Sequence, residues 1–218
     1  MLIYFIVHAL SISRVYYMLT AELALPALIT AVLAYLAGSV SAAILVCHAM
    51  GLDDPRTKGS GNPGATNVLR VGGKLPAALT LLGDGLKGFL PVFVTAMMTS
   101  HPPTIALAAI AAFIGHLYPI FFQFQGGKGV ATALGALLGV SLSVGALALL
   151  TWLAVSLTFK RSSLAALVTF VLVPLYLLFD AQHVFALAFV IIAGFLFYTH
   201  RSNISRLIDG SEPLIGKR

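Results

Sequence analysis

Charged residues are scarce in this 218-residue chain. Asp, Glu, Lys and Arg together make up 9% of it, whereas hydrophobic residues make up 59%. A soluble domain of this size needs a much more polar surface, so the composition excludes a soluble globular protein. Apolar runs of roughly 18 or more residues recur along the chain, which is typical of a bundle of transmembrane helices.

Acidic residues and cysteine are also few. The 13 basic and 7 acidic residues give a net charge of +6, but no basic stripe is interleaved with aromatic residues, so we expect no nucleic-acid partner. Lys- and Arg-rich loops are normal on the cytoplasmic side of a membrane protein. Cys47 is the single cysteine, which excludes an intrachain disulfide.

Residues 1–25 are expected to form an N-terminal extension whose role stays open. The apolar stretch 2–12 is short for a membrane span, and Arg14 follows it. No A-x-A-like site indicates a removable signal peptide. Three alternatives are open: translation starts at Met18, so that residues 1–17 are not native; the segment is an amphipathic cap; or it extends the first helix.

Apolar runs and helix breakers predict an all-α integral membrane protein, with a membrane domain over 26–199. Pro26 suits a first helical turn, and Pro102-Pro103 marks an exposed turn. The 30 residues 130–159 fit either two short helices hinged near 143–145 or one long tilted helix. The expected helices are 26–50, 76–99, 104–122, 130–143, 145–159, 163–179 and 183–199.

The distribution of Lys and Arg selects between six and seven helices. With seven, the basic residues of the loops 51–75 and 123–130, of Lys160-Arg161 and of the tail 200–218 all share one side. With six, Lys160-Arg161 and the tail would move to the opposite side. The positive-inside rule therefore predicts seven transmembrane helices, with the N-terminus outside and the C-terminus cytosolic.

The first polar motif, 59–70, has the composition of an anion-binding loop. Its glycines permit tight turns that point successive N–H groups at one anion. Arg70 offers a planar fork that matches phosphate. Hydroxyl, amide and backbone donors complete the set of candidate residues, which are Ser60, Gly61, Asn62, Thr66 and Asn67.

Two further motifs pair cations with donors. Gly126, Gly127, Lys128 and Gly129 directly precede a predicted helix, whose N-terminus presents free N–H groups and a partial positive charge. The third motif contains His200, Asn203 and Arg206, which are spaced three residues apart. If the last helix continues through this motif, the three side chains share one face. Neither glycine-rich motif ends in Gly-Lys-Ser/Thr, which argues against nucleotide binding.

Charged residues also lie inside the predicted spans. Asp84 and Lys87 have i, i+3 spacing, which allows them to pair and to brace the bundle under the motif loops. His116 is placed near the same end of its helix and is expected to support a loop. His48 and Asp53 match a His-x4-Asp pattern that is known from one class of glycerolipid acyltransferases, and we attribute this match to chance.

The three motifs closely resemble those of the PlsY family. The resemblance rests on 59–70, on 115–119 followed by 126–132, and on 200–207, and it runs from about residue 26 to 212. It implies a bacterial inner-membrane acyl-phosphate:glycerol-3-phosphate acyltransferase with its site facing the cytosol. The residues it implies for glycerol 3-phosphate and catalysis are Ser60, Arg70, Lys128, His200 and Asn203. The sequence departs from the family after Glu212, where Pro213-Leu214 replaces the usual x-Lys.

The resemblance also implies the reaction and its partners. The enzyme is expected to transfer an acyl group from long-chain acyl phosphate to glycerol 3-phosphate, giving lysophosphatidic acid and phosphate, without metal or cofactor. A transient link to the soluble enzyme that makes acyl phosphate is implied too, besides contact with membrane lipids. Because acyl phosphate is already activated, direct attack is favoured over a covalent acyl-enzyme. The alternative is a membrane transporter of phosphate or an organic phosphate, although no internal repeat supports it.

Overall fold

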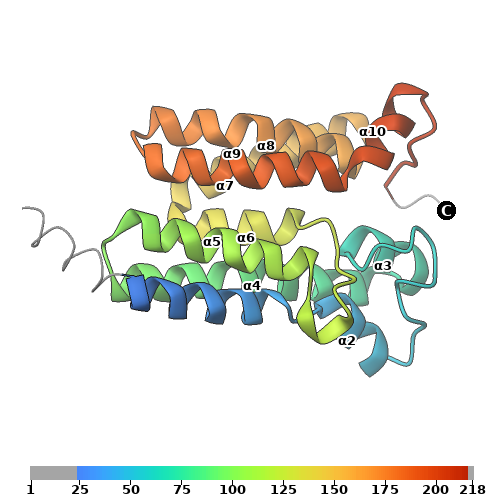
Figure 1. The fold of residues 1–218 in the computed structure, drawn as a ribbon. Helices are drawn as coiled ribbons and strands as arrows, with labels where there is room; N and C mark the ends of the chain where they lie inside the picture. The colour runs from blue at the N-terminus through green and yellow to red at the C-terminus, as the bar shows by residue number, and fades with distance from the viewer. Residues whose placement is uncertain (1–23, 216–218) are drawn as a thin grey trace, which may run out of the picture.

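The computed structural model describes residues 24–215, all of them helical or in connecting loops (Figure 1). The alternatives for residues 1–17, together with Lys217 and Arg218, lie outside this range. Residues 24–38 form the first helix, and the further elements in chain order are α2 (Ala42–Ala49), α3 (Ala65–Gly72), α4 (Lys74–Met98), α5 (Pro102–Leu117), η1 (Ile120–Phe122), α6 (Val130–Val140), α7 (Leu142–Phe159), α8 (Ser162–Phe179), α9 (His183–Thr199) and α10 (Arg201–Ile208).

The all-α membrane fold is confirmed, whereas the count of seven spans stays a prediction. Within residues 24–215, five helices are long and apolar enough to cross a membrane. A sixth span results if α9 and α10, which meet at a bend of 64°, are counted together. The remaining apolar helix, α6, has 11 residues, which at about 1.5 Å each cover only about half of a 30 Å hydrocarbon core.

Residues 130–159 were predicted to form either two short helices or one long helix, and the structure shows two. The break falls at Ser141, a few residues earlier than the predicted hinge, and its backbone is extended there (φ −150°). The Ser141 hydroxyl accepts a hydrogen bond from the Val144 N–H, so it caps the start of α7. The serine cap therefore fixes where α7 begins, directly after α6 ends at Val140.

Two predicted helices are shorter than expected. The first span, predicted as continuous over 26–50, is interrupted at residues 39–41 between the first helix and α2. The helix predicted over 104–122 ends at Leu117, because Pro119 lacks a backbone N–H and disfavours helical geometry at Tyr118. The short turn η1 follows, and it leads into the loop that carries the second motif.

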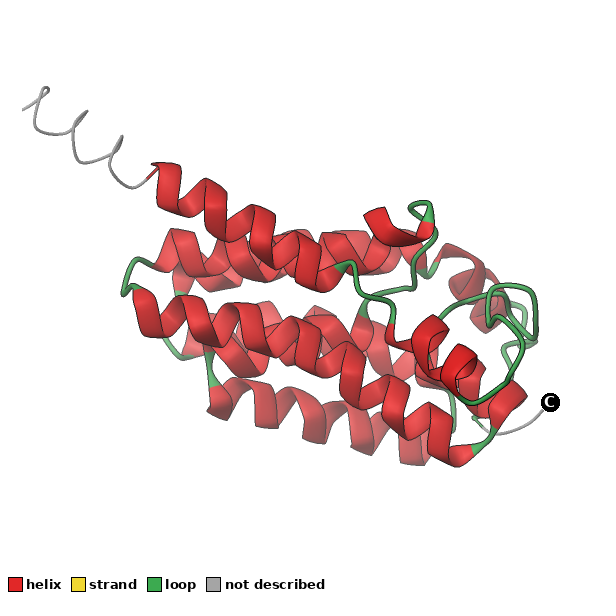
Figure 2. Ribbon diagram, turned by 90° about the horizontal axis from the view of Figure 1, so that it is seen from below, coloured by secondary structure: helices red, strands yellow, loops and turns green. Residues whose placement is uncertain are grey.

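The helices form two layers that run along a common direction (Figures 1 and 2). One layer holds the first helix with α4, α5 and α6, and the other holds α7, α8 and α9. Contacts of α5 with α9 and of α6 with α7 join them. The buried core lies between the layers and includes Phe113, Leu137, Phe170 and Phe189, each at most 1% exposed.

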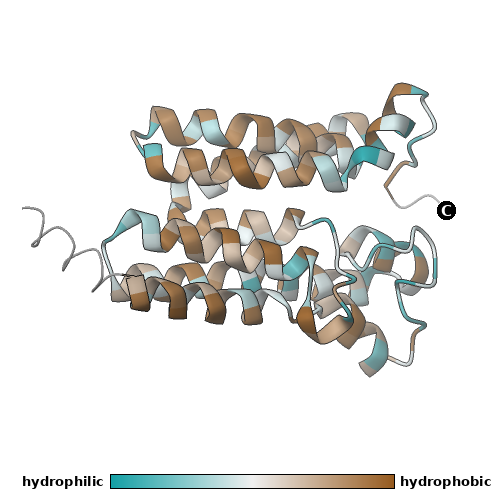
Figure 3. Cartoon of the chain, viewed as in Figure 1, coloured by the Kyte–Doolittle hydropathy of each residue, from teal (hydrophilic) through white to brown (hydrophobic). Residues whose placement is uncertain are grey.

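Polar residues gather at one end of the bundle (Figure 3). That end holds α2, α3, α10 and the loops that carry the first two motifs (Figure 1). The predicted meeting of the three motifs at one face thus appears in the structure.

Close packing of α4 on α6 gives a stability prediction. A Cβ placed at Gly88 would lie 2.0 Å from the Thr132 carbonyl oxygen, whereas one placed at Gly85 meets nothing within 4 Å. We expect Gly88→Ala to destabilise the protein by about 1–3 kcal/mol, as overpacked cores do. Gly85→Ala, on the same helix, is the matched control and should melt no lower than the wild type. Equal melting temperatures of the two variants would contradict this packing.

Candidate functional site

The first motif is folded by one buried amide. Asn67, 1% exposed, donates from Nδ2 to the carbonyls of Pro55 (2.8 Å) and Lys58 (3.0 Å). Its Oδ1 accepts from the Ser60 N–H at 2.8 Å. Gly59, at φ +60°, gives the chain the left-handed turn needed to bring Ser60 there. Asn67 therefore shapes the loop in this structure, and its predicted contact with substrate stays a prediction.

The second motif lies directly on the end of α5. The Gly127 N–H donates to the His116 carbonyl at 3.2 Å. A Cβ at Gly127 would come within 2.4 Å of His116 Nε2 and 3.0 Å of the Pro63 carbonyl oxygen, so the first and second motifs touch here. Only glycine fits between these groups, and the backbone is held at the N-terminus of α6 (Val130–Val140).

The second and third motifs are joined by a side-chain network. Lys128 Nζ donates to Asn203 Oδ1, and Asn203 Nδ2 donates to Glu212 Oε1 at 2.6 Å. Arg206 Nε donates to Glu212 Oε2 at 2.8 Å. The condition that the last helix continues is not met, since the chain bends by 64° between α9 and α10, yet α10 still directs Asn203 and Arg206 to one carboxylate.

Glu212 is the residue that the sequence analysis missed as a member of the site. It is 7% exposed and also accepts from the Ser163 hydroxyl at 2.6 Å. Arg161 Nε donates to its carbonyl at 3.2 Å, so the tail is fixed to the start of α8. The available signal was the presence of two carboxylates, Asp209 and Glu212, in a basic tail, where pairing with a nearby cation is favoured.

Burial and neighbouring groups shift the pKa values of Lys128 and Glu212. Burial lowers the pKa of Lys128 to about 8, with the charges of Arg206 and Arg70 acting in the same direction and Glu212 opposing them. Burial alone would raise the pKa of Glu212, but hydrogen bonds from Ser163, Asn203 and Arg206 keep it below its ordinary value. Arg70 Nε is buried without a hydrogen-bond partner among the described residues. Lys128 thus feels the charges of Arg70, Arg206 and Glu212, and the three cations outnumber the one carboxylate, which leaves an excess of positive charge.

Other predicted residues are placed around this network. Ser60 and Gly61 are exposed on the first loop, next to the half-buried Asn62. Thr66 lies 3.2 Å from the Ser162 hydroxyl, which connects α3 to α8. His200 is buried, and its Nδ1 donates to the Leu196 carbonyl at 2.8 Å, so Nε2 is the nitrogen left to accept a proton.

The charged pair inside the span is present. Asp84 Oδ1 lies 2.9 Å from Lys87 Nζ and 3.6 Å from His116 Nδ1, with all three side chains buried. By contrast, Asp53 pairs with Lys58 at 3.4 Å, and both His48 and Asp53 are exposed. Among the described residues, no three His, Cys, Asp or Glu side chains are grouped as a metal site would require.

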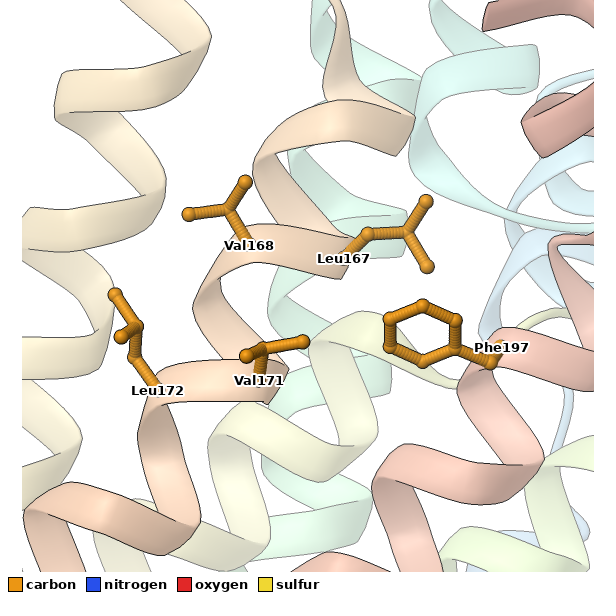
Figure 4. A pocket seen from close by; sticks show the side chains of 5 residues that line it. All are labelled: Leu167, Val168, Val171, Leu172 and Phe197. Atoms are coloured by element: carbon orange, nitrogen blue, oxygen red, sulfur yellow. The ribbon is translucent and has the colours of Figure 1, made fainter. Parts of the chain in front are cut away.

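An apolar groove begins one helical turn from the polar network. It has a volume of about 260 Å³ and lies between α8 and α9 (Figure 4). Leu167, at one end of it, follows Ser163 by one turn of α8, and Phe197 precedes His200 by three residues on α9. The lining residues are Leu167, Val168, Val171, Leu172 and Phe197.

Comparison with known proteins identifies relatives over most of the chain. Residues 28–210 match the family described as glycerol-3-phosphate acyltransferase. Glycerol-3-phosphate acyltransferases from Methylococcus capsulatus and Thioalkalivibrio sulfidiphilus are each 53% identical, across 85% of this chain and 94% and 92% of theirs. The crystal structure of PlsY, an integral membrane glycerol 3-phosphate acyltransferase, in its glycerol 3-phosphate form has a TM-score of 0.82 at 38% identity, covering 87% of this chain and 95% of that one. Its lysophosphatidic acid form has a TM-score of 0.81 at 37% identity, with the same coverage. The resemblance to the PlsY family is confirmed.

The pKa of Lys128 gives a pH prediction. Below about pH 8 its ammonium is charged and can bind an anion, and above that pH the charge is lost. We expect kcat/KM for glycerol 3-phosphate to fall above about pH 8 in the wild type. Lys128→Arg keeps its charge at any accessible pH, so its descending limb should move to higher pH even if turnover is low. If the descending limb of the kcat/KM profile stayed at the same pH in Lys128→Arg, a group other than Lys128 would be responsible for it.

Glu212→Gln tests the carboxylate at the centre of the network. Its removal takes the charged acceptor away from Ser163, Asn203 and Arg206, so the protein should lose about 1–3 kcal/mol of stability, as expected when buried hydrogen-bonding groups lose a charged partner. The descending pH limb should also move to lower pH, because Glu212 favours the charged form of Lys128. Asp209→Asn, an exposed carboxylate in the same tail, is the control. Melting curves and pH profiles that do not distinguish the two variants would refute this role.

Proposed function

Because the chain belongs to the glycerol-3-phosphate acyltransferase family, we propose that it transfers an acyl group from acyl phosphate to the 1-hydroxyl of sn-glycerol 3-phosphate. The products are lysophosphatidic acid and phosphate. The observation that carries the proposal is the network of Lys128, Asn203, Arg206 and Glu212, which joins the motifs around an excess of positive charge. Such a site suits a reaction in which both substrates are anions.

The chemistry requires orientation and charge stabilisation more than a nucleophile. The mixed anhydride of acyl phosphate is already activated, so the glycerol hydroxyl attacks it directly and phosphate leaves. Arg70 and Lys128 with the glycine loop hold the phosphate groups, and the Ser60 loop orients the substrate. His200 Nε2 or a substrate phosphate oxygen takes the proton. In this scheme no covalent acyl-enzyme, metal or cofactor takes part.

The orientation in the membrane follows the distribution of charge. We propose seven membrane-crossing helices with the N-terminus outside and the polar end in the cytosol. In the structure the loops bearing Arg56 and Lys128 lie at the same end as α10, which supports this arrangement (Figure 1). A cytosolic site is also where both a soluble glycerol 3-phosphate and an acyl donor made by a soluble enzyme are available.

The groove between α8 and α9 is proposed to receive the acyl chain. It is entirely apolar, and Val171 within it is 51% exposed, so it is open toward the lipid. A chain lying in it would place the activated carboxyl near Ser163 and His200. The donor could then enter sideways from the bilayer while glycerol 3-phosphate enters from water.

The direct test is phosphate release by detergent-purified protein given palmitoyl phosphate and glycerol 3-phosphate, without CoA or acyl carrier protein. Release should require both substrates and should yield lysophosphatidic acid. If the folded protein binds glycerol 3-phosphate but releases nothing, acyl phosphate is not the donor. A liposome flux assay would then test the transporter alternative.

Loss of a single cation should reduce turnover strongly. We expect Arg70→Ala and Lys128→Ala each to lower kcat/KM by roughly 10²-fold or more, in the range found for lost electrostatic donors. His48→Ala, which removes an exposed side chain from α2, should keep wild-type activity. Near-normal rates in both cation variants would refute the site, and an inactive His48→Ala would revive the His-x4-Asp hypothesis.

The groove predicts a chain-length effect. Val171→Trp narrows it, so palmitoyl phosphate should lose at least about 10-fold in kcat/KM relative to octanoyl phosphate, since each buried CH₂ contributes about 0.8 kcal/mol. Val190→Trp on α9, with a similar exposed fraction of 53%, lies outside the groove and is the control. Equal ratios in the two variants would place the acyl chain elsewhere.

A further inference from the structure

A series of buried polar contacts runs from the break in the first span to the glycine loop. At the break, between residues 24–38 and α2, the backbone leaves helical geometry. Lys87 Nζ, on α4, donates to the Val40 carbonyl in this break at 2.7 Å. Because a backbone carbonyl at membrane depth needs a donor, Lys87 compensates the interruption of the helix.

Asp84 continues the series toward α5. Its Oδ1 lies 2.9 Å from Lys87 Nζ and 3.6 Å from His116 Nδ1. The side chains of Asp84, Lys87 and His116 are 4%, 8% and 5% exposed, so all three are shielded from bulk water. The carboxylate therefore lies between a cation of its own helix and the imidazole of the next one.

His116 ends the series beneath Gly127. Its carbonyl accepts the Gly127 N–H at 3.2 Å, and its Nε2 would be only 2.4 Å from a Cβ at Gly127. The imidazole thus fills the space under the peptide that precedes Lys128. If the ring moved, the Gly127 peptide packed against it would move as well. Lys128 would then reach Asn203 from a different position.

We propose that Asp84 and Lys87 are positioning residues that act through His116 to hold the glycine loop where it binds the phosphate of glycerol 3-phosphate. The inference rests on the proposed phosphate-binding function of that loop. A pair that served only the packing of α4 would need neither the contact to the span break nor the one to His116. Here both contacts exist, and together they connect the first span, α4 and α5 to the loop.

A double-mutant cycle on glycerol 3-phosphate binding tests whether the pair acts through His116. Asp84→Asn with Lys87→Met removes both charges together, so that neither is left unpaired. We expect the pair variant and His116→Ala each to raise the Kd in calorimetry about 10-fold, and their combination to bind no more weakly than His116→Ala alone. Effects that multiply to about 100-fold would show independent contributions and overturn the proposal.

Three further variants keep the test decisive. His116→Leu fills the ring's space without its nitrogens and replaces His116→Ala in the cycle if that variant does not fold. Val92→Ala, fully buried on the same helix, should lower the melting temperature and leave the Kd unchanged. If Val92→Ala raised the Kd as much as the pair variant does, Asp84 and Lys87 would have a packing role only. Lys128→Ala tests the proposed function separately. An unchanged Kd in this variant would refute phosphate binding at the loop. An unchanged Kd in the pair variant alone would refute only the positioning role of Asp84 and Lys87.

Discussion

The carboxylate of Glu212 is the constraint on which the rest of the site depends. It accepts from Ser163, Asn203 and Arg206, which belong to α8 and α10. A carboxylate accepts hydrogen bonds only, so it forces the Asn203 amide to turn its NH₂ group inward and its oxygen toward Lys128. One anion therefore fixes the orientation of the amide, whose donor meets Glu212 and whose acceptor meets Lys128.

The same carboxylate makes it possible to hold several cations close together. Arg70, Lys128 and Arg206 repel one another in a bundle of low dielectric constant, and Arg70 Nε is buried without a hydrogen-bond partner within residues 24–215. A single counter-charge leaves the site positive, with the N-terminus of α6 adding to it.

The sequence predicts the apolar spans and the side on which the polar motifs lie, because the membrane constrains both. Spans such as 74–98 and 162–179 are long apolar runs, because the hydrocarbon core admits little else, and the motifs meet because basic loops favour one side. The break at Ser141 was predicted as one of two alternatives, but a few residues too late, near 143–145. The break at residues 39–41 was not predicted, since Lys87 compensates it through a contact that no local pattern reveals. Glu212 was missed for a similar reason: its partners Ser163 and Asn203 lie 49 and 9 residues away in the sequence.

The shortness of α6 explains where the reaction can take place. With only 11 residues it begins inside the bundle, and the loop that carries Lys128 must reach inward to meet it (Figure 1). That depth accounts for the burial of Lys128 and for its lowered pKa. It also brings the cations to the level at which the apolar groove of α8 and α9 begins. A site at the rim would hold glycerol 3-phosphate but not the end of an acyl chain, and a site at the midplane would exclude the water-soluble substrate. Because α6 is short, the loop that precedes it lies between these two limits, where a soluble and a lipid substrate can meet.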